Sequence, residues 1–112
     1  MTLVTVDTLK AMYTMFCKFP PFNKYKLPPP SKIEWLIVND PDMYGQYQPE
    51  PHAITISTAR CGHLDTIQRT LVHEMVHMIL YLQGKRYELH NKNFFNFTNT
   101  IATLYGWDPK EL

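Results

Sequence analysis

Proline divides this chain into a middle part that cannot contain long helices and two flanking parts that can. Eight of the nine prolines lie between Pro20 and Pro51, and the ninth is Pro109. Because proline fixes φ and lacks a backbone N–H, it is excluded from helix interiors. Long helices must therefore lie before Pro20 or after Pro51, and the middle part must be built from loops and short strands.

The part before Pro20 has a helical pattern, whereas the middle part has strand patterns. Apolar side chains recur at helical spacing over residues 6–18, which predicts a first helix. Three short runs rich in β-branched or aromatic residues, at 32–39, 43–48 and 53–57, predict three strands. The short connections between these runs favour a small, mainly antiparallel sheet.

After Ser57 the pattern becomes helical again. One apolar stripe runs from Leu64 to Leu82 and stops before Gly84, and a last helix is predicted over residues 91–105, closed by Gly106. The expected order is helix, three strands, helix, helix, which is an α+β fold. A length of 112 residues with 45% hydrophobic residues suits one domain that spans residues 1–112.

Composition excludes several classes of protein. Eleven Lys and Arg against ten Asp and Glu give a net charge of +1, without the basic excess of a dedicated nucleic-acid binder. Two cysteines, Cys17 and Cys61, can build neither a disulfide framework nor a four-cysteine zinc ribbon. The most apolar stretch contains His73, Glu74 and His77, so it is no membrane span. With no signal-like start, we expect an intracellular, cytoplasmic protein that does not enter the membrane.

The second predicted helix contains the motif His73-Glu74-Met75-Val76-His77. Residues four apart lie one turn above each other, so His73 and His77 project from one face and can hold one metal ion. Glu74 is offset by about 100° around the helix axis, so it can reach a metal-bound water without ligating the metal. Zn²⁺ lowers the pKa of such a water to roughly 7, and a carboxylate can accept its proton during attack on a carbonyl. The motif therefore predicts a hydrolytic zinc site.

Coincidence explains this motif poorly. With five His and five Glu among 112 residues, a random order produces it about once in a hundred sequences. The motif also falls in the middle of an apolar helical segment, where His and Glu without partners are costly to bury. Metal binding therefore explains the motif better than a purely structural role in the core.

The third ligand of a catalytic zinc site has to come from outside the motif, because such sites have three protein ligands and one open position. His90 lies just before the last predicted helix, and a chain reversal near Gly84 can bring it back to the metal face. The alternatives are Glu88, His52 and His63.

These residues resemble the SprT-like metallopeptidase family, which includes the Spartan protease domain of eukaryotes. The likeness is strongest from Ile54 to Trp107: a short strand (AITIS, 53–57), a helix entering LVHEMVH (71–77), and a third His followed four residues later by Phe, here His90 and Phe94. The family commonly has H-G-x-x-F at this last point, whereas this chain has Asn91 in place of Gly. Asn can adopt the left-handed conformation or cap a helix nearly as well as Gly, so the departure is small.

The resemblance implies a zincin-like minimal metallopeptidase domain. It implies that His73, His77 and His90 bind Zn²⁺ and that Glu74 is the general base and acid. The expected activity is that of a zinc-dependent endopeptidase acting on a protein or peptide substrate. Because relatives of the Spartan type act on proteins bound or crosslinked to DNA, DNA-associated proteins are candidate substrates.

Peptide hydrolysis also needs a place for the substrate and a stabiliser for the oxyanion. Residues 43–47 form a candidate edge strand along which an extended peptide could pair, and Gly45 would permit close approach. Tyr81, four residues after His77, and Tyr87, three before His90, are candidate oxyanion stabilisers. Tyrosines in such places more often serve in packing, so neither phenol is assigned this role.

Two functions other than proteolysis remain open. A catalytically weak or inactive zinc-fold module could bind a protein or nucleic-acid partner, and lysines at positions 10, 18, 24, 26 and 32 make the N-terminal third more basic than the rest. A hydrolase for another substrate is the second alternative. Small metal-dependent ribonucleases with an H-x-x-x-H helix lack a glutamate in the place of Glu74, which argues against that group.

Overall fold

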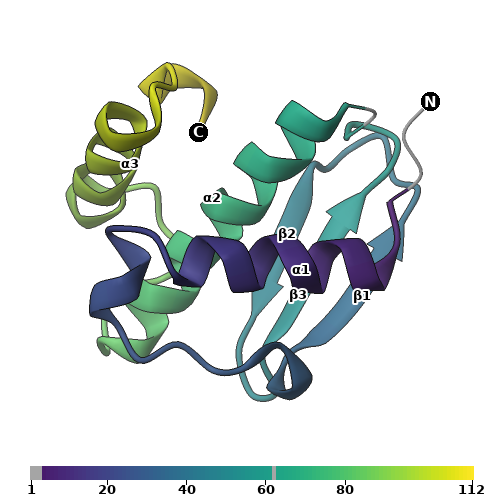
Figure 1. The fold of residues 1–112 in the computed structure, drawn as a ribbon, viewed down its shortest axis with the longest axis horizontal. Coiled ribbons are helices and arrows are strands. Elements are labelled where there is room, and N and C mark those ends of the chain that lie inside the picture. The colour runs from purple at the N-terminus through teal and green to yellow at the C-terminus, as the bar shows by residue number, and fades with distance from the viewer. Residues whose placement is uncertain (1–3, 62) are drawn as a thin grey trace.

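The computed structural model describes residues 4–61 and 63–112, and its elements follow the predicted order (Figure 1). Within this part of the chain, three α-helices accompany a three-stranded sheet, which confirms the α+β class. In chain order the elements are α1 (Val6–Cys17), β1 (Glu34–Val38), β2 (Gly45–Gln48), β3 (Ala53–Ser57), α2 (Leu64–Leu82) and α3 (Lys92–Tyr105). Short 3₁₀ turns lie at Phe22–Lys24 (η1), Pro30–Lys32 (η2) and Pro109–Glu111 (η3).

Local capping sets where two of the helices begin and end. Thr5 starts α1, because its Oγ1 accepts a hydrogen bond of 3.1 Å from the N–H of Thr8. Asn91 starts α3, because its Oδ1 accepts from the N–H of Asn93 at 3.1 Å and of Phe94 at 3.3 Å. The expectation that Asn91 can cap a helix in place of the family's glycine is therefore confirmed. Gly106, with φ +74°, ends α3 in the left-handed conformation that glycine adopts without strain.

The sheet is mixed, which corrects the expectation of a mainly antiparallel one. Its strand order is β1-β3-β2, and β3 pairs antiparallel with β2 but parallel with β1. The reason is the path of residues 39–44. These residues lead the chain from β1 to a strand position that is not adjacent to β1, and β3 then pairs between β1 and β2. Ser57 stabilises this connection, because its hydroxyl donates a hydrogen bond of 2.7 Å to the carbonyl of Asp40.

One face of the sheet carries the core. Register and alternation put four buried side chains on this face: Trp35, Tyr47, Ile54 and Ile56. Helix α1 packs there, since the rings of Tyr13 and Trp35 meet edge to face at 5.5 Å. Figure 1 shows α1 crossing in front of the strands and α2 running beside β2. The site residues of α2 are therefore presented next to an edge strand.

The C-terminal third folds back on α2. After α2 the chain reverses through residues 83–91, and α3 then packs against α2. The last residues return from α3 toward α2, where the C-terminal end is marked in Figure 1. No helix of the described residues combines the length and the apolar character needed to cross a bilayer.

Candidate metal centre

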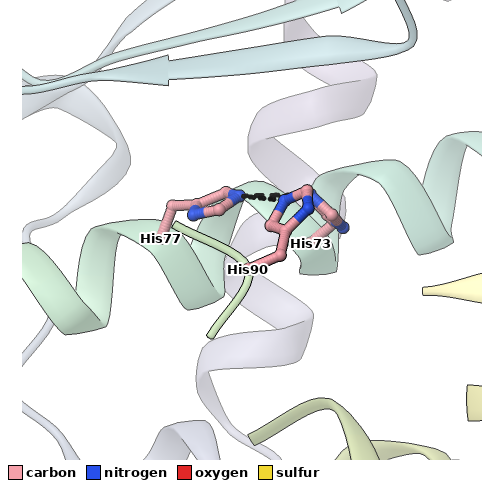
Figure 2. A group of neighbouring side chains, drawn as sticks. All are labelled: His73, His77 and His90. Atoms are coloured by element: carbon pink, nitrogen blue, oxygen red, sulfur yellow. Dashed lines mark hydrogen bonds between the residues drawn. The ribbon is translucent and has the colours of Figure 1, made fainter. Parts of the chain in front are cut away.

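Three histidines from two parts of the chain converge beside α2 (Figure 2). His73 and His77 project from adjacent turns of α2, and His90 reaches them from the segment just before α3. The Nε2 atom of His77 lies 3.1 Å from that of His73 and 3.3 Å from that of His90. The potential ligand atoms of all three lie within 4.8 Å of one another. The structure thus brings together the three histidines that the sequence predicts as ligands.

The spacing and the protonation of these rings suit a metal ion. Tetrahedral coordination with metal–nitrogen bonds of about 2.0–2.1 Å separates ligand nitrogens by about 3.3 Å, close to the two observed spacings. The main-chain carbonyl of Tyr87 accepts a hydrogen bond from Nδ1 of His77, so in the neutral ring Nε2 carries the lone pair. Nitrogen lone pairs that converge in this way are satisfied by a cation. The cluster could therefore hold a metal ion.

Phe94 forms a common base for the three imidazole rings. Its ring centroid lies 4.8 Å from that of His73, 4.7 Å from that of His77 and 4.6 Å from that of His90. The side chain is 1% exposed. Because Asn91 caps α3, Phe94 lies in the first turn of that helix and directly below the rings. The sequence pairs His90 with Phe94 in one motif, and the structure gives Phe94 this packing role.

The histidine cluster, as the described residues form it, includes none of the alternative third ligands. Glu88 is exposed and pairs with Arg86, whose Nε lies 3.2 Å from its Oε1. His52 shares a hydrogen bond of 2.6 Å with the hydroxyl of Tyr47. His63 is the exposed N-cap residue of α2. Geometry therefore favours His90 over all three.

Glu74 is a buried carboxyl group beside the histidines. It is 5% exposed and lines the same cleft as His73 and His90. Burial raises its pKa from 4.5 to about 8, because the charged form loses its hydration. In the metal-free protein near pH 7, Glu74 is therefore mostly protonated. A cation held by the histidines would favour its charged form.

The pKa values of His73 and His77 are lowered, which keeps these two rings neutral near pH 7. Burial, and after it repulsion from His77 and His90, lowers the pKa of His73 from 6.5 to about 4. Burial also lowers the pKa of His77, although the Tyr87 carbonyl opposes this change. Since metal ligands must be deprotonated, low pKa values at His73 and His77 keep these rings ready to bind.

Comparison with known proteins identifies the family. The model of the SprT-like family matches residues 26–110. The chain belongs to the SprT-like family. The matched range contains the whole sheet, α2, α3 and all four predicted site residues. No curated protein and no solved structure matches the chain significantly. Family membership and the histidine cluster together indicate a metallopeptidase-like domain with a possible metal site.

A cleft opens beside the cluster of this SprT-like chain. Its volume is about 750 Å³, and both α2 and Gly45 at the start of β2 contribute to its lining. Four groups of residues line it: the site residues His73, Glu74 and His90; residues 42–44 with Gly45, the first residue of β2; the α2 residues Thr66, Arg69 and Thr70; and Arg60 with the C-terminal residues 110–112. Residues 45–47 of the predicted edge segment 43–47 lie in β2, which is an edge strand because it pairs only with β3 among the described strands, whereas residues 43 and 44 precede the strand.

The C-terminal residues in the cleft have no signal in the sequence. Glu111 lies 3.7 Å from the guanidinium of Arg69, and Arg69 also pairs with Asp65 one turn earlier on α2. Leu112 packs against the edge of the core. Only the three-dimensional path after α3 brings this segment of the SprT-like chain to the wall of the site.

Tyr81 and Tyr87, the two tyrosines considered as oxyanion stabilisers, are not among the described residues that line the cleft. The hydroxyl of Tyr81 donates to the carboxylate of Glu50. Tyr87 reaches the site through its main-chain carbonyl, which accepts from His77. Sequence reasoning missed this contact, because any residue type can supply a carbonyl.

Proposed function

We propose that this SprT-like protein is a zinc-dependent endopeptidase, with His73, His77 and His90 as ligands and Glu74 as general base and acid. The observation that carries the proposal is the convergence of three imidazole nitrogens beside a buried carboxyl group in one cleft. An all-imidazole donor set suits zinc. When bound, zinc would lower the pKa of a water molecule to about 7 and polarise the scissile carbonyl.

Glu74 is suited to move a proton in both directions. Its buried position raises its pKa to about 8 in the metal-free protein, and positive charge nearby lowers the pKa again. A group whose pKa lies near the working pH can both accept and release a proton. Glu74 accepts a proton from the attacking water and then donates it to the leaving amine.

The free edge of β2 is suited to bind an extended peptide. The N–H of Ser57 donates to the carbonyl of Tyr44, so these two residues form a hydrogen-bonded pair of the antiparallel ladder. Hydrogen-bonded and non-hydrogen-bonded pairs alternate along such a ladder. Gly45 and Tyr47 belong to non-hydrogen-bonded pairs, so their N–H and C=O groups point away from β3. A substrate strand that pairs with these groups passes Glu74, since Gly45 lies against it. Main-chain pairing of this kind recognises peptides in general, which supports an endopeptidase of broad sequence specificity.

The decisive experiment compares the wild type with Glu74→Gln. We expect both proteins to hold about one zinc ion per chain, and cleavage by the variant to fall by about 10²–10⁴-fold. Casein and a DNA-bound protein serve as parallel substrates, so that preference for DNA-associated proteins is measured in the same assay. Glu88→Gln is the matched control, because this exposed glutamate lies outside the cluster.

Two outcomes contradict the proposal. A Glu74→Gln protein that loses its zinc would show that Glu74 is a ligand. A zinc-loaded wild type that cleaves neither substrate would favour the alternative, a zinc-fold module that binds a protein or nucleic-acid partner.

A further inference from the structure

Three tyrosines from three parts of the chain meet beside His77. Tyr47 comes from β2, Tyr81 from α2 one turn after His77, and Tyr87 from the loop of residues 83–91. The ring of Tyr87 meets that of Tyr47 at 5.9 Å and that of Tyr81 at 5.5 Å, each with planes 87° apart. The rings of Tyr47 and Tyr81 lie 6.4 Å apart. We call these three residues the tyrosine cluster.

Tyr87 joins this cluster to the histidines in two ways. Its main-chain carbonyl accepts the hydrogen bond from Nδ1 of His77. Its position on the loop is three residues before His90, and its ring packs against the edge of the core. The neighbouring loop residues Arg86, Glu88 and Leu89 are exposed. Between the N–H of Lys85, which donates to the carbonyl of Leu80, and the ring of His90, Tyr87 therefore attaches the middle of residues 85–90 to the body of the protein.

We propose that the tyrosine cluster is a positioning device for the metal ligands. Through its carbonyl, Tyr87 fixes the tautomer and the orientation of His77, and through its ring it sets the place of His90. Tyr47 and Tyr81 act by holding the Tyr87 ring. The inference rests on the proposed zinc site and adds to it three residues that are neither ligands nor catalytic residues.

The physical reason is that the cluster restricts two motions: the tautomer exchange and rotation of the His77 ring, and the movement of the loop that carries His90. A neutral imidazole without a partner at Nδ1 exchanges between tautomers and rotates, so the lone pair at Nε2 points at the metal for only part of the time. A loop without an anchor spreads His90 over many positions, and the ion must then supply the free energy that orders the loop. Outer contacts of this kind to ligating histidines typically change metal affinity by about 10–100-fold.

Two of the three hydroxyl groups of the cluster are engaged elsewhere, and within the described part of the chain the Tyr87 hydroxyl has no hydrogen bond to the histidines. The hydroxyl of Tyr47 shares a hydrogen bond with His52, and that of Tyr81 donates to Glu50. Both partners lie in the turn between β2 and β3, away from the histidine cluster. The proposal therefore assigns the positioning of Tyr87 to its ring and its carbonyl, and it predicts that Tyr87→Phe behaves as the wild type.

The test measures zinc affinity by competition with a chromophoric chelator, alongside thermal unfolding of the metal-free protein. Tyr87→Ala is expected to bind zinc about 10–100-fold more weakly, and Tyr87→Phe to restore wild-type affinity. Tyr81→Ala, at a half-buried helix position that accepts alanine, is expected to weaken zinc binding in the same direction. Tyr25→Ala is the control: it removes a half-buried tyrosine that packs on Phe97, so it should lower the unfolding temperature and leave zinc affinity unchanged.

The outcomes separate this inference from the proposed function. If wild type and a folded Tyr87→Ala bind zinc equally tightly, the positioning role is wrong and the zinc site stands. Equal loss of affinity in Tyr25→Ala would also overturn it, because any loosening of the fold would then suffice. If Tyr87→Ala does not fold, Tyr81→Ala decides, and unchanged affinity there rejects the proposal. A wild type that binds no zinc rejects both proposals.

Discussion

Gly45 on β2 lies against Glu74 on α2 with no room for a side chain between them. A Cβ atom at position 45 would lie 3.3 Å from Oε2 of Glu74, 2.9 Å from Cγ2 of Thr70 and 2.6 Å from the carbonyl oxygen of Thr55. A backbone oxygen and a β-branched side chain cannot easily move aside. The absent side chain therefore sets how closely the edge strand approaches the buried carboxyl group.

Gly45→Ala should accordingly separate the edge strand from α2. We expect the free energy of unfolding to fall by about 1–3 kcal/mol, as in other overpacked sites, and peptide cleavage to fall with it. Urea unfolding and a cleavage assay measure the two effects. The neighbouring Gln46→Ala, at an exposed position on the other face of β2, should stay within about 0.5 kcal/mol of the wild type. A Gly45→Ala protein with the wild-type urea midpoint contradicts this account.

His90→Ala should remove most of the bound zinc, because two imidazoles hold zinc much less tightly than three. Its thermal unfolding in the presence of zinc should also begin at a lower temperature, since an ion that binds the native state stabilises it by mass action. Elemental analysis after gel filtration measures the metal. We expect wild-type zinc content in three control variants, Glu88→Ala, His52→Ala and His63→Ala. If one of these variants loses zinc while His90→Ala retains it, the substituted residue of that variant is the third ligand and His90 is not.

The metal-free protein should lose stability between pH 4.5 and pH 8 through Glu74. In this range the unfolded chain releases the Glu74 proton, whereas the folded protein keeps it until its raised pKa of about 8. The native state then binds more protons, so the free energy of unfolding falls as pH rises. Glu74→Gln removes this dependence, and its stability relative to the wild type should grow by about 3–5 kcal/mol across the range.

His73 has the opposite dependence and cancels in this comparison. Its folded pKa of about 4 lies below the unfolded value of 6.5, so its contribution to stability is lost as pH falls between these values in both proteins. Chemical unfolding of the two metal-free proteins at several pH values measures the difference. If the free energies of unfolding of the wild type and Glu74→Gln change with pH by the same amount, Glu74 is not a buried neutral acid.

Much of the fold could be predicted because its signals are local. The helix bounds follow from apolar periodicity and from caps such as Asn91, and AITIS is a strand as expected. Strand order could not be predicted, since the parallel pairing of β1 with β3 depends on the path of residues 39–44 and not on either strand's own sequence. Sequence patterns fix elements better than they fix which elements become neighbours.

The same distinction applies to the site. Spacing on one helix predicts that His73 and His77 face the same way, and the family resemblance selects His90 among the alternatives. The carbonyl of Tyr87 carries no sequence signal, because every residue has one. The segment 110–112 reaches the cleft only through the turn after α3. Contacts made by main-chain atoms and by distant segments had to come from the structure.

Phe94→Leu tests the common base of the three imidazoles. The smaller side chain leaves space under the rings, so zinc affinity should fall by about tenfold and the free energy of unfolding by about 1–2 kcal/mol. Phe95→Leu is the matched control, because Phe95 is adjacent in sequence and 50% exposed. This substitution should change neither zinc affinity nor the free energy of unfolding appreciably. Equal effects of the two substitutions on zinc affinity would argue against a special role for Phe94.

A crystal structure of the zinc-loaded protein, with anomalous data collected at the zinc edge, tests the central claim most directly. We predict one anomalous peak per chain, about 2.0–2.1 Å from the Nε2 atoms of His73, His77 and His90, with Glu74 beside it and outside bonding distance. A peak bonded to Glu74, a peak that lacks one of the three histidines, or no peak at saturating zinc would contradict the account.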